Sequence, residues 1–465
     1  MTESTPAHRQ DIASYPLTRR LAEFVVSLKK TAIPPEVQSI VLTGFTDCVG
    51  VTLAGADEDV CRILDRAMVP SIGGASTLFS TNLAHPAQAA WINATAAHAL
   101  DYDDAALRGH PSAVLVPTII AECQDQNLSG ADAITAYVAG YEVWAELAHR
   151  DRHSHHRKGW HPTGIFGSIA AAAACASLHN LDADATTNAI AIAASCSSGI
   201  MANFGSMTKP FHAGRSAQAG VMAARLAKGG MSAAADALEH PQGFLSAVSF
   251  AGEVDKATPV HAVNKWHILR YGLNLKKYPM CYCTHRPIDA MIDLAEAHAI
   301  TPEQVERVSV SISGRNATVL RNHAPKTALE AKFSIEFAMA SSIVARKVGL
   351  EQVEDGFVQR PDIQALIPKV SVVICEEEDP DSGYAPYDFV VVRLKDGRTL
   401  ESARVADARG AHAIPLTRQE KLEKFLDCAV SAGLESNAVQ LFERLESLDR
   451  EKDLHFLNGV ARSRQ

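Results

Sequence analysis

The segment from Gly164 to Leu178, GIFGSIAAAAACASL, constrains the fold more than any other part of this sequence. It is apolar on every side of a helix, so it has no face that could be turned to water. Its alanines and glycines are small and let neighbouring helices approach closely. At about 15 residues it is shorter than the roughly 20 that a membrane-spanning helix needs. We therefore expect it to form the central helix of a bundle.

The first 270 residues predict one helix after another. Pro34 and Pro35 open a run from Glu36 to Ala54 with apolar residues at helical spacing. Proline suits a first helical turn, where the backbone donor has no partner in any case. Further helices are expected at about 86–98, 112–123, 130–148, 162–178, 184–197 and 212–229.

The pattern changes after about residue 270 to the alternation of apolar and polar residues that is typical of strands. Two helices interleave with these strands, at 287–298 and roughly 331–348. The last two strands flank Lys395–Arg398, a turn with the Asp-Gly pair that hairpins favour. These features predict a small α+β domain with an antiparallel sheet. The expected strands are Val305–Ser313, Lys369–Cys375, Phe389–Leu394 and Thr399–Val405.

The tail from Thr417 to Leu448 is helical again and too short to fold alone, so we expect it to pack on the N-terminal bundle. The chain has 465 residues, more than the roughly 250–300 at which one core stops growing. The prediction is a mostly α fold of two domains. Residues 1–269 and 406–465 form a large all-helical domain, and residues 270–405 form a smaller inserted α+β domain.

Charge and cysteine usage exclude several classes of protein. The formal net charge is -9, and no basic stripe offers a surface for nucleic acid. The nine cysteines are scattered, odd in number and without a CxxC pair, which indicates reduced thiols. The polar N-terminal residues lack the apolar centre of a signal peptide. We expect a soluble, cytoplasmic protein with no membrane partner.

No nucleotide, metal or nucleophile motif stands out: GxGxxG, the P-loop, HExxH and GxSxG are missing from the sequence. Two segments contain metal-ligand residue types. One holds His153, His155 and His156, and the other holds Cys281, Cys283 and His285. Neither has the second ligand pair of a zinc site, so a solvated basic loop and reduced thiols are the favoured interpretations. We predict that the protein uses no metal and no cofactor.

Four segments gather ionisable groups beside glycine and proline. The first, HALDYDD, begins at His98 and contains Asp101, Asp103 and Asp104, which repel one another. In a cleft this raises at least one pKa and creates a candidate acid or base. Alternatively, Asp103 or Asp104 caps the helix that starts near Pro111. The second, GWHPTG, places His161 at a helix start, where protonation is disfavoured. Its imidazole is suited to general-base work or, alternatively, to packing in the core.

The third segment, MTKPFHAGR, places Lys209 at a helix start, where backbone donors add to a carboxylate cradle. A surface lysine is the alternative. The fourth, KKYPMCYCTH, lies at the expected domain junction, where ligand clefts are common. It makes Lys276, Tyr278 and His285 candidates for substrate binding, with solvated linker lysines as the alternative.

Taken together and in this order, the segments resemble the successive signatures of the MmgE/PrpD family. The resemblance covers roughly residues 20 to 440. Each motif alone is weak, but six in order are strongly specific for the family and much less specific for the reaction. The motifs are HALDYDD with a following HPS, GYE at 140–142, GWHPTG, MTKPFHAGR, KKYPMCYCTH and AKFS at 331–334.

The resemblance implies an all-helical domain from N- and C-terminal segments, an inserted α+β domain and a homodimer. Known members include 2-methylcitrate dehydratase, cis-aconitate decarboxylase and iminodisuccinate epimerase, none of which needs a metal. Two departures concern the first motif. Ala105 stands where the decarboxylase-like pattern has threonine, and the spacing from DYDD to HPS is a residue or two shorter than in several members. The implied site residues are Asp101, His110, His161, Lys209 and Lys276.

We therefore expect a cofactor-independent hydro-lyase that acts on 2-methylcitrate or a related small polycarboxylate. Lys209 and Lys276 would bind substrate carboxylates and stabilise the charge that develops as a proton leaves the neighbouring carbon. His161 or Asp101 would remove that proton and His110 would donate one. The alternatives are an epimerase of iminodisuccinate-like acids, a cis-aconitate-type decarboxylase and a non-enzymatic binding protein.

Overall fold

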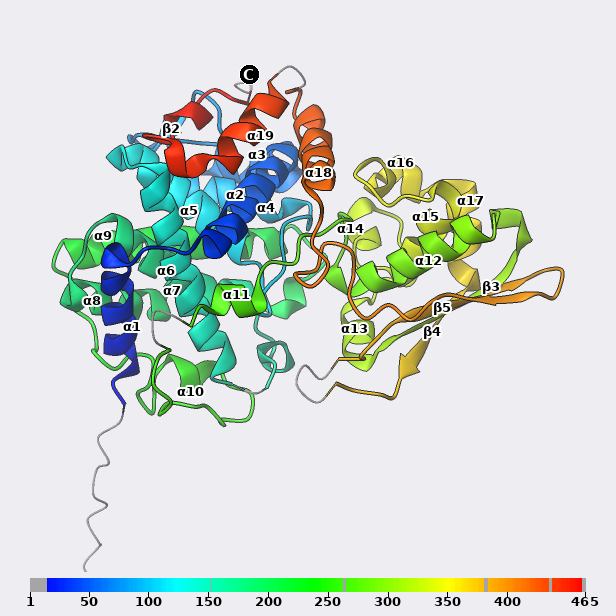
Figure 1. Cartoon of the computed structure of the whole chain (residues 1–465), viewed down its shortest axis with the longest axis horizontal. Coiled ribbons are helices and arrows are strands. Elements are labelled where there is room, and N and C mark those ends of the chain that lie inside the picture. Colours follow the sequence, from blue (N-terminus) through cyan, green and yellow to red (C-terminus); the bar gives the residue numbers. More distant parts are fainter. Residues whose placement is uncertain (1–14, 152, 262–264, 380–383, 435–436, 462–465) are drawn as a thin grey trace, which may run out of the picture.

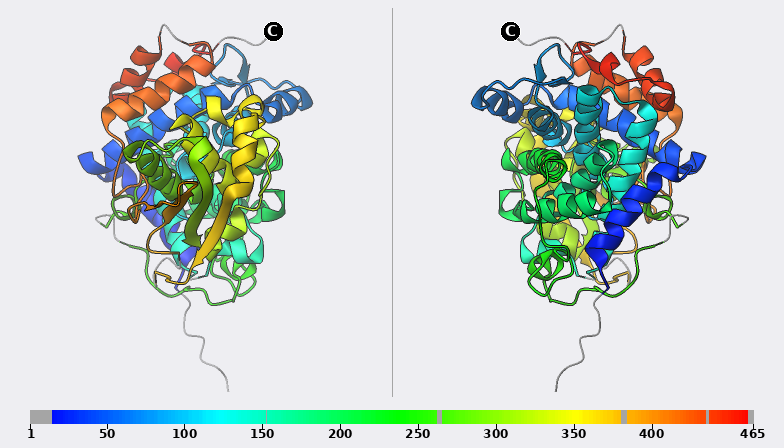
Figure 2. Two further views of the ribbon diagram at one scale, coloured as in Figure 1. Left: turned by 90° about the vertical axis from the view of Figure 1, so that its right-hand side faces the viewer. Right: turned by 90° about the vertical axis from the view of Figure 1, so that its left-hand side faces the viewer.

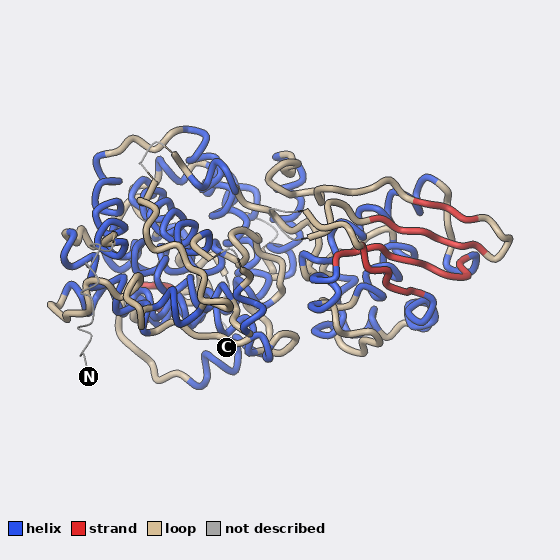
Figure 3. Tube along the Cα trace, turned by 90° about the horizontal axis from the view of Figure 1, so that it is seen from below, coloured by secondary structure: helices blue, strands red, loops and turns tan. Residues whose placement is uncertain are grey.

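Two hydrophobic cores organise the protein. The computed structural model describes residues 15–151, 153–261, 265–379, 384–434 and 437–461. The larger core draws on residues between Leu17 and Leu275 and again between Leu416 and Leu457, and the smaller one on residues between Tyr278 and Leu394. The two cores correspond to a large helical lobe and a smaller lobe that carries the main sheet (Figures 1 and 3). The fold is mostly α, as expected, and the predicted residue boundaries agree with this packing but stay a prediction.

Helix α7 (Pro162–Leu178) lies at the centre of the large domain, and every one of its residues is buried. It is surrounded by α5 (Pro111–Gln126), α6 (Gly130–His149), α8 (Ala183–Ser195) and α9 (Thr208–Lys228). Small residues permit this packing, since a Cβ added to Gly220 of α9 would lie 2.2 Å from the Cβ of Ala171. The expectation of a central apolar helix is confirmed.

The remaining helices of the large domain cover this centre. Helix α2 packs against α4 and α5, and it is the one helix in the described residues that is long and apolar enough to cross a membrane. It is mostly buried within the fold, which is the ordinary position of a core helix. The elements are α1 (Leu17–Ser27), α2 (Pro35–Gly55), α3 (Asp59–Ala67), β1 (Ala75–Ser76), β2 (Leu83–Ala84), α4 (Pro86–Ala99), α10 (Phe244–Val248) and α11 (His267–Tyr271).

The small domain holds a four-stranded sheet in the order β4-β3-β5-β6, seen in front of the helical domain in the left view of Figure 2. Helices α12 and α15 pack against the sheet. The strands are β3 (Val305–Ser313), β4 (Val370–Cys375), β5 (Phe389–Leu394) and β6 (Thr399–Glu401). The helices are α12 (His285–Ala297), α13 (Gly314–Val319), α14 (Ala328–Ala331), α15 (Ile335–Ala345), α16 (Asp355–Val358) and α17 (Pro361–Leu366).

The sheet is mixed, which corrects the expectation of a purely antiparallel one. Strand β3 pairs antiparallel with β5, and β5 with β6 through the predicted Asp-Gly turn, but β3 and β4 run parallel. Parallel neighbours need a long crossover connection. The helices α13 to α17 supply that crossover, which the alternation within single strands does not reveal.

The C-terminal helices return to the large domain, as expected. Helix α18 (Arg418–Ser431) and helix α19 (Ala438–Glu446) pack on α2 and on each other. The rings of Phe425 and Phe442 lie 5.5 Å apart at this junction, and both are buried. The end of the chain is therefore part of the helical core.

We predict that Phe442→Ala lowers the free energy of unfolding by about 3–5 kcal/mol, because it leaves a cavity among buried side chains. Denaturant unfolding followed by circular dichroism measures the change. Val439→Ala on the same helix is the control, since Val439 is 46% exposed and surface changes are usually within about 0.5 kcal/mol. A Phe442 variant as stable as the Val439 variant would contradict the packing of this tail.

Candidate active site

The loop that follows α4 places a carboxylate between two lysines. Helix α4 ends at Ala99, and Asp101 adopts a left-handed backbone conformation with φ of 51°, which turns the chain out of the helix. The Oδ1 atom of Asp101 lies 2.5 Å from the Nζ atom of Lys209 and 2.9 Å from that of Lys276. All three side chains are buried. Lys209 comes from the first turn of α9, and Lys276 from the segment between the two cores.

The two lysines keep Asp101 ionised. Burial alone disfavours a carboxylate, but the nearby ammonium groups of Lys209 and Lys276 outweigh it and hold the pKa of Asp101 well below its usual range. Burial likewise disfavours the charge on Lys276, yet Asp101 and Asp103 raise its pKa. A carboxylate held in this way is a weak base. The geometry therefore favours Asp101 as the group that gathers the lysines, and it argues against Asp101 as the base.

Three buried lysines from different parts of the chain hold backbone carbonyls of this loop. Lys276 Nζ donates to the Asp101 carbonyl at 2.7 Å, and Lys424 Nζ on α18 donates to the Tyr102 carbonyl at 2.9 Å. Lys332, the lysine of the AKFS motif, donates to the Ala99 carbonyl at 3.4 Å. Both domains and the C-terminal helix thus fix the path of one short segment.

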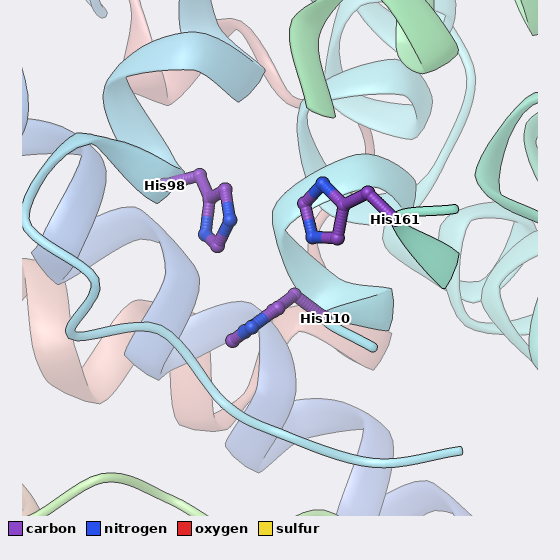
Figure 4. Close-up of side chains that lie close together, drawn as sticks. All are labelled: His98, His110 and His161. Atoms are coloured by element: carbon purple, nitrogen blue, oxygen red, sulfur yellow. The ribbon is translucent and has the colours of Figure 1, made fainter. Parts of the chain in front are cut away.

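Three histidines meet beside the loop (Figure 4). The ring centroids of His98 and His110 are 4.4 Å apart, those of His98 and His161 are 5.8 Å apart, and those of His110 and His161 are 6.4 Å apart. His110 and His161 each precede the proline that opens a helix, α5 and α7 respectively. A residue before proline avoids helical geometry, so each histidine stands at the helix entrance.

Asp103 orients two of these rings. Its Oδ1 lies 2.9 Å from Nδ1 of His98, and its Oδ2 lies 3.0 Å from Nδ1 of His110. Asp104 has a different task, since it accepts hydrogen bonds from the backbone and hydroxyl of Ser112 at the start of α5. Burial raises the pKa of Asp104 to about 8. The helix-capping alternative thus holds for Asp104, whereas Asp103 serves the histidines.

His161 has a neutral imidazole in the free protein. Burial, followed by the positive charge of Lys209, lowers its pKa well below the usual value. Its Nδ1 lies 3.1 Å from Nδ1 of His212, and burial lowers the pKa of His212 to about 4. Lys209 and His212 are three residues apart near the start of α9. Neutral imidazoles beside fixed cations are ready to take up a proton once an anion binds.

The five residues implied by the resemblance therefore lie in one site. Of the two further candidates, His285 is close enough for the charges of Lys276 and Asp101 to act on it, and its Nδ1 has no hydrogen-bond partner among the described residues. The Tyr278 hydroxyl donates to Asp289 at 2.5 Å, and His285 packs edge-on against Tyr278 in the small domain. These contacts shape the start of α12 and occupy the hydroxyl. A role of Tyr278 and His285 in substrate binding stays a prediction.

The histidine cluster also has the spacing of a possible metal site. One nitrogen from each of His98, His110 and His161 lies within 4.8 Å of the others. A second set with this spacing joins His98 and His110 to Asp101 and Asp103. The ammonium groups of Lys209 and Lys276 lie beside Asp101. The nearby positive charge opposes a divalent cation.

The loop that contains His155 differs from the expected solvated loop, since His155 is buried against Phe166.

Comparison with known proteins bears on this arrangement. A model of the MmgE/PrpD N-terminal domain matches residues 19–256, and a model of the MmgE/PrpD C-terminal domain matches residues 278–447. The chain belongs to the MmgE/PrpD family. The second match includes α18 and α19, so the family's C-terminal region contributes helices to the large domain here.

Several curated relatives in the MmgE/PrpD family carry the name cis-aconitate decarboxylase. The human protein is 27% identical over 378 residues, which cover 78% of this chain and 77% of the relative. The mouse protein is 26% identical and covers 87% of this chain and 85% of its own length. The Aspergillus terreus protein is 25% identical and covers 79% of this chain and 80% of its own length.

Three residues of this MmgE/PrpD site were not identified from the sequence. His98 stands in the HALDYDD motif, and Lys332 in AKFS, but neither had been given a role. Lys424 lies in an ordinary amphipathic helix and becomes part of the site only through folding. His98 and Lys332 could have been found from the sequence, because each is an ionisable residue within a family motif and had no other role assigned to it.

The buried histidines predict loss of stability in acid. Burial lowers the pKa of His98 to about 3 and those of His155 and His212 to about 4. The unfolded chain, with histidine pKa values near 6.5, then binds more protons than the fold, so stability falls as the pH drops from about 6.5 towards 4. We expect a lower melting temperature at pH 5 than at pH 7.5 in calorimetry. An unchanged melting temperature over that range would contradict neutral burial of these rings.

Proposed function

We propose that this protein is a lyase that acts on a small polycarboxylate and moves a proton at a carbon next to a carboxylate. The single observation that carries the proposal is the convergence of Lys209 and Lys276 on Asp101 beside three histidines. Around Asp101, two ammonium groups and one carboxylate leave about one unit of local positive charge, separate from the negative charge of Asp103 between His98 and His110. This excess charge favours an anionic substrate and the negative charge that develops on its carboxylate during reaction.

Binding of a polycarboxylate also changes the histidines. Their pKa values are lowered in the free protein by burial and by Lys209. Two or three substrate carboxylates in the same space oppose both effects and favour the imidazolium form. The imidazoles are thus neutral before the substrate binds, and one of them can take up an additional proton afterwards. His161 and the Asp103-supported His110 are the acid–base groups that the motifs imply.

The most specific reaction we propose is decarboxylation of cis-aconitate, which the names of the relatives support. In that reaction the bond from carbon to one carboxylate breaks, and its electron pair becomes a new double bond. The electron pair of the old double bond takes a proton from an imidazolium, and carbon dioxide leaves. The lysines bind the carboxylates that remain.

Dehydration of 2-methylcitrate is the second candidate, because Ala105 departs from the decarboxylase-like pattern. This residue is bridged through its backbone to Asn274, close to Lys276 in the chain. The decarboxylase-like pattern has a threonine hydroxyl at this position, and this chain lacks it. Proton removal next to a carboxylate and protonation of the departing hydroxyl would use the same lysines and histidines.

A panel of three acids tests the function. Purified protein is incubated with cis-aconitate, 2-methylcitrate or iminodisuccinate, and carbon dioxide, alkene products and stereochemistry are followed. We expect loss of cis-aconitate with one equivalent of carbon dioxide. Dehydration of 2-methylcitrate without release of carbon dioxide would contradict the decarboxylase proposal and support the dehydratase. Loss of stereochemical purity in iminodisuccinate, or no reaction with any acid, would contradict the lyase.

Two substitutions separate binding from proton transfer. Lys209→Met removes one carboxylate-binding cation, so it should chiefly raise KM. Lys158→Met is the control, at a lysine whose ammonium group donates to the Ala247 and Ser249 carbonyls outside the site. His161→Gln should lower kcat by about 10²–10⁴-fold, the usual contribution of a positioned acid or base. His155→Gln, at a buried histidine outside the site, is its control. Near-normal kcat in His161→Gln would remove that residue from the mechanism.

We also predict that activity survives exhaustive dialysis against EDTA. The charge near the histidines is already supplied by Lys209 and Lys276, and a divalent cation would be repelled by them. The measurement compares kcat before and after dialysis and after addition of Mg²⁺, Mn²⁺, Fe²⁺ or Zn²⁺. Activity lost on dialysis and restored by one of these ions would contradict the metal-free account.

A further inference from the structure

His98 is a histidine of the site to which the motifs assign no role. It lies in the last turn of α4, and its side chain is fully buried. Its ring is the nearest of the cluster to His110 and lies almost parallel to that of His161, at an angle of 22° (Figure 4). Its two nitrogens have different surroundings, and this difference is informative.

The Nδ1 atom of His98 is fully engaged. It lies 2.9 and 3.1 Å from the two oxygens of Asp103, and a carboxylate can only accept a hydrogen bond. The proton of the neutral ring therefore resides on Nδ1. The other nitrogen, Nε2, is left with a lone pair that can accept a proton.

The Nε2 atom of His98 is buried and has no hydrogen-bond partner within the described part of the chain. A buried polar atom without a partner costs about 1–3 kcal/mol, and in native proteins such atoms are usually met by water or a ligand. A histidine that served only to pack the core would not need this arrangement. An atom of this kind among catalytic side chains points to a bound molecule.

Asp103 couples His98 to His110, because both of its oxygens reach Nδ1 of His98 and its Oδ2 also lies 3.0 Å from Nδ1 of His110. Nδ1 of His110 also lies 2.8 Å from the Asp104 carbonyl oxygen, so the proton of its neutral ring resides on Nδ1 as well. Two neutral imidazoles and one carboxylate carry a single negative charge, so the group can hold one additional proton at no net charge. The two ends differ in access to water. The side chain of His110 is 14% exposed, whereas those of His98 and Asp103 are 0% exposed. His110 is therefore the end that can exchange protons with solvent.

We propose that His98 is a further catalytic residue, whose Nε2 contacts the bound polycarboxylate and exchanges the proton at the reacting carbon. His110 links the His98–Asp103–His110 group to solvent, and His161, whose ring centroid lies 5.8 Å from that of His98, contacts the same substrate. In the decarboxylation the N–H electron pair stays on Nε2 as the proton passes to carbon. The electron pair of the old double bond forms the new C–H bond, and His98 returns to the neutral imidazole, so that the group again carries a single negative charge. This inference rests on the proposed function.

The decisive variants are His98→Asn and His98→Gln. The amide nitrogen of asparagine can occupy the position of Nδ1, so His98→Asn keeps a donor to Asp103 but lacks Nε2. A role limited to holding Asp103 predicts kcat within about threefold of wild type. The proposal predicts a loss of about 10²-fold or more at unchanged melting temperature. The assay uses whichever acid the wild-type protein converts.

A binding measurement tests the same point without turnover. Tricarballylate, the saturated analogue of cis-aconitate, is titrated by calorimetry in buffers of different ionisation enthalpy to count protons taken up on binding. We expect His98→Asn and His98→Gln to take up about one proton fewer than the wild-type protein. Equal uptake together with near-normal kcat would overturn the role of His98 while leaving the proposed function intact. A wild-type protein that converts none of the three acids would instead contradict the proposed function.

Discussion

The ion pairs of Asp101 with Lys209 and Lys276 are the constraint on which the rest of the site depends. A buried charge is costly unless it is paired, and breaking such a pair leaves an uncompensated charge in the interior. Lys209 belongs to the bundle and Lys276 to the segment between the two cores, so the pairing fixes both at one point. The left-handed turn at Asp101 makes the carboxylate available to both lysines.

The same charges control the protonation of the histidines. Burial and the charge of Lys209 lower the pKa values of His98 and His161 and favour neutral rings in the free protein, while Asp103 fixes which nitrogen of His98 bears the proton. A polycarboxylate supplies the negative charge that is missing from this environment. Substrate binding and readiness for proton transfer are thus linked by electrostatics.

Much of this could be predicted from the sequence, because the relevant patterns are local. The apolar run at Gly164–Leu178 predicted the central helix, and the histidines before Pro111 and Pro162 predicted side chains at helix entrances. The parallel pairing of β3 with β4 and the return of Lys424 to the catalytic loop depend on contacts between distant segments. Asp101 was expected to be a possible base, but its paired lysines, close only in the folded chain, argue for a different role.

The most direct test of the account follows the proton itself. The wild-type protein is incubated with cis-aconitate in deuterium oxide, and the product is analysed by NMR and mass spectrometry. The account predicts one deuterium in each product molecule, at the carbon that gains a hydrogen next to a retained carboxylate. Product that forms without deuterium at that carbon would contradict the claim that histidines of this site deliver a solvent-derived proton there.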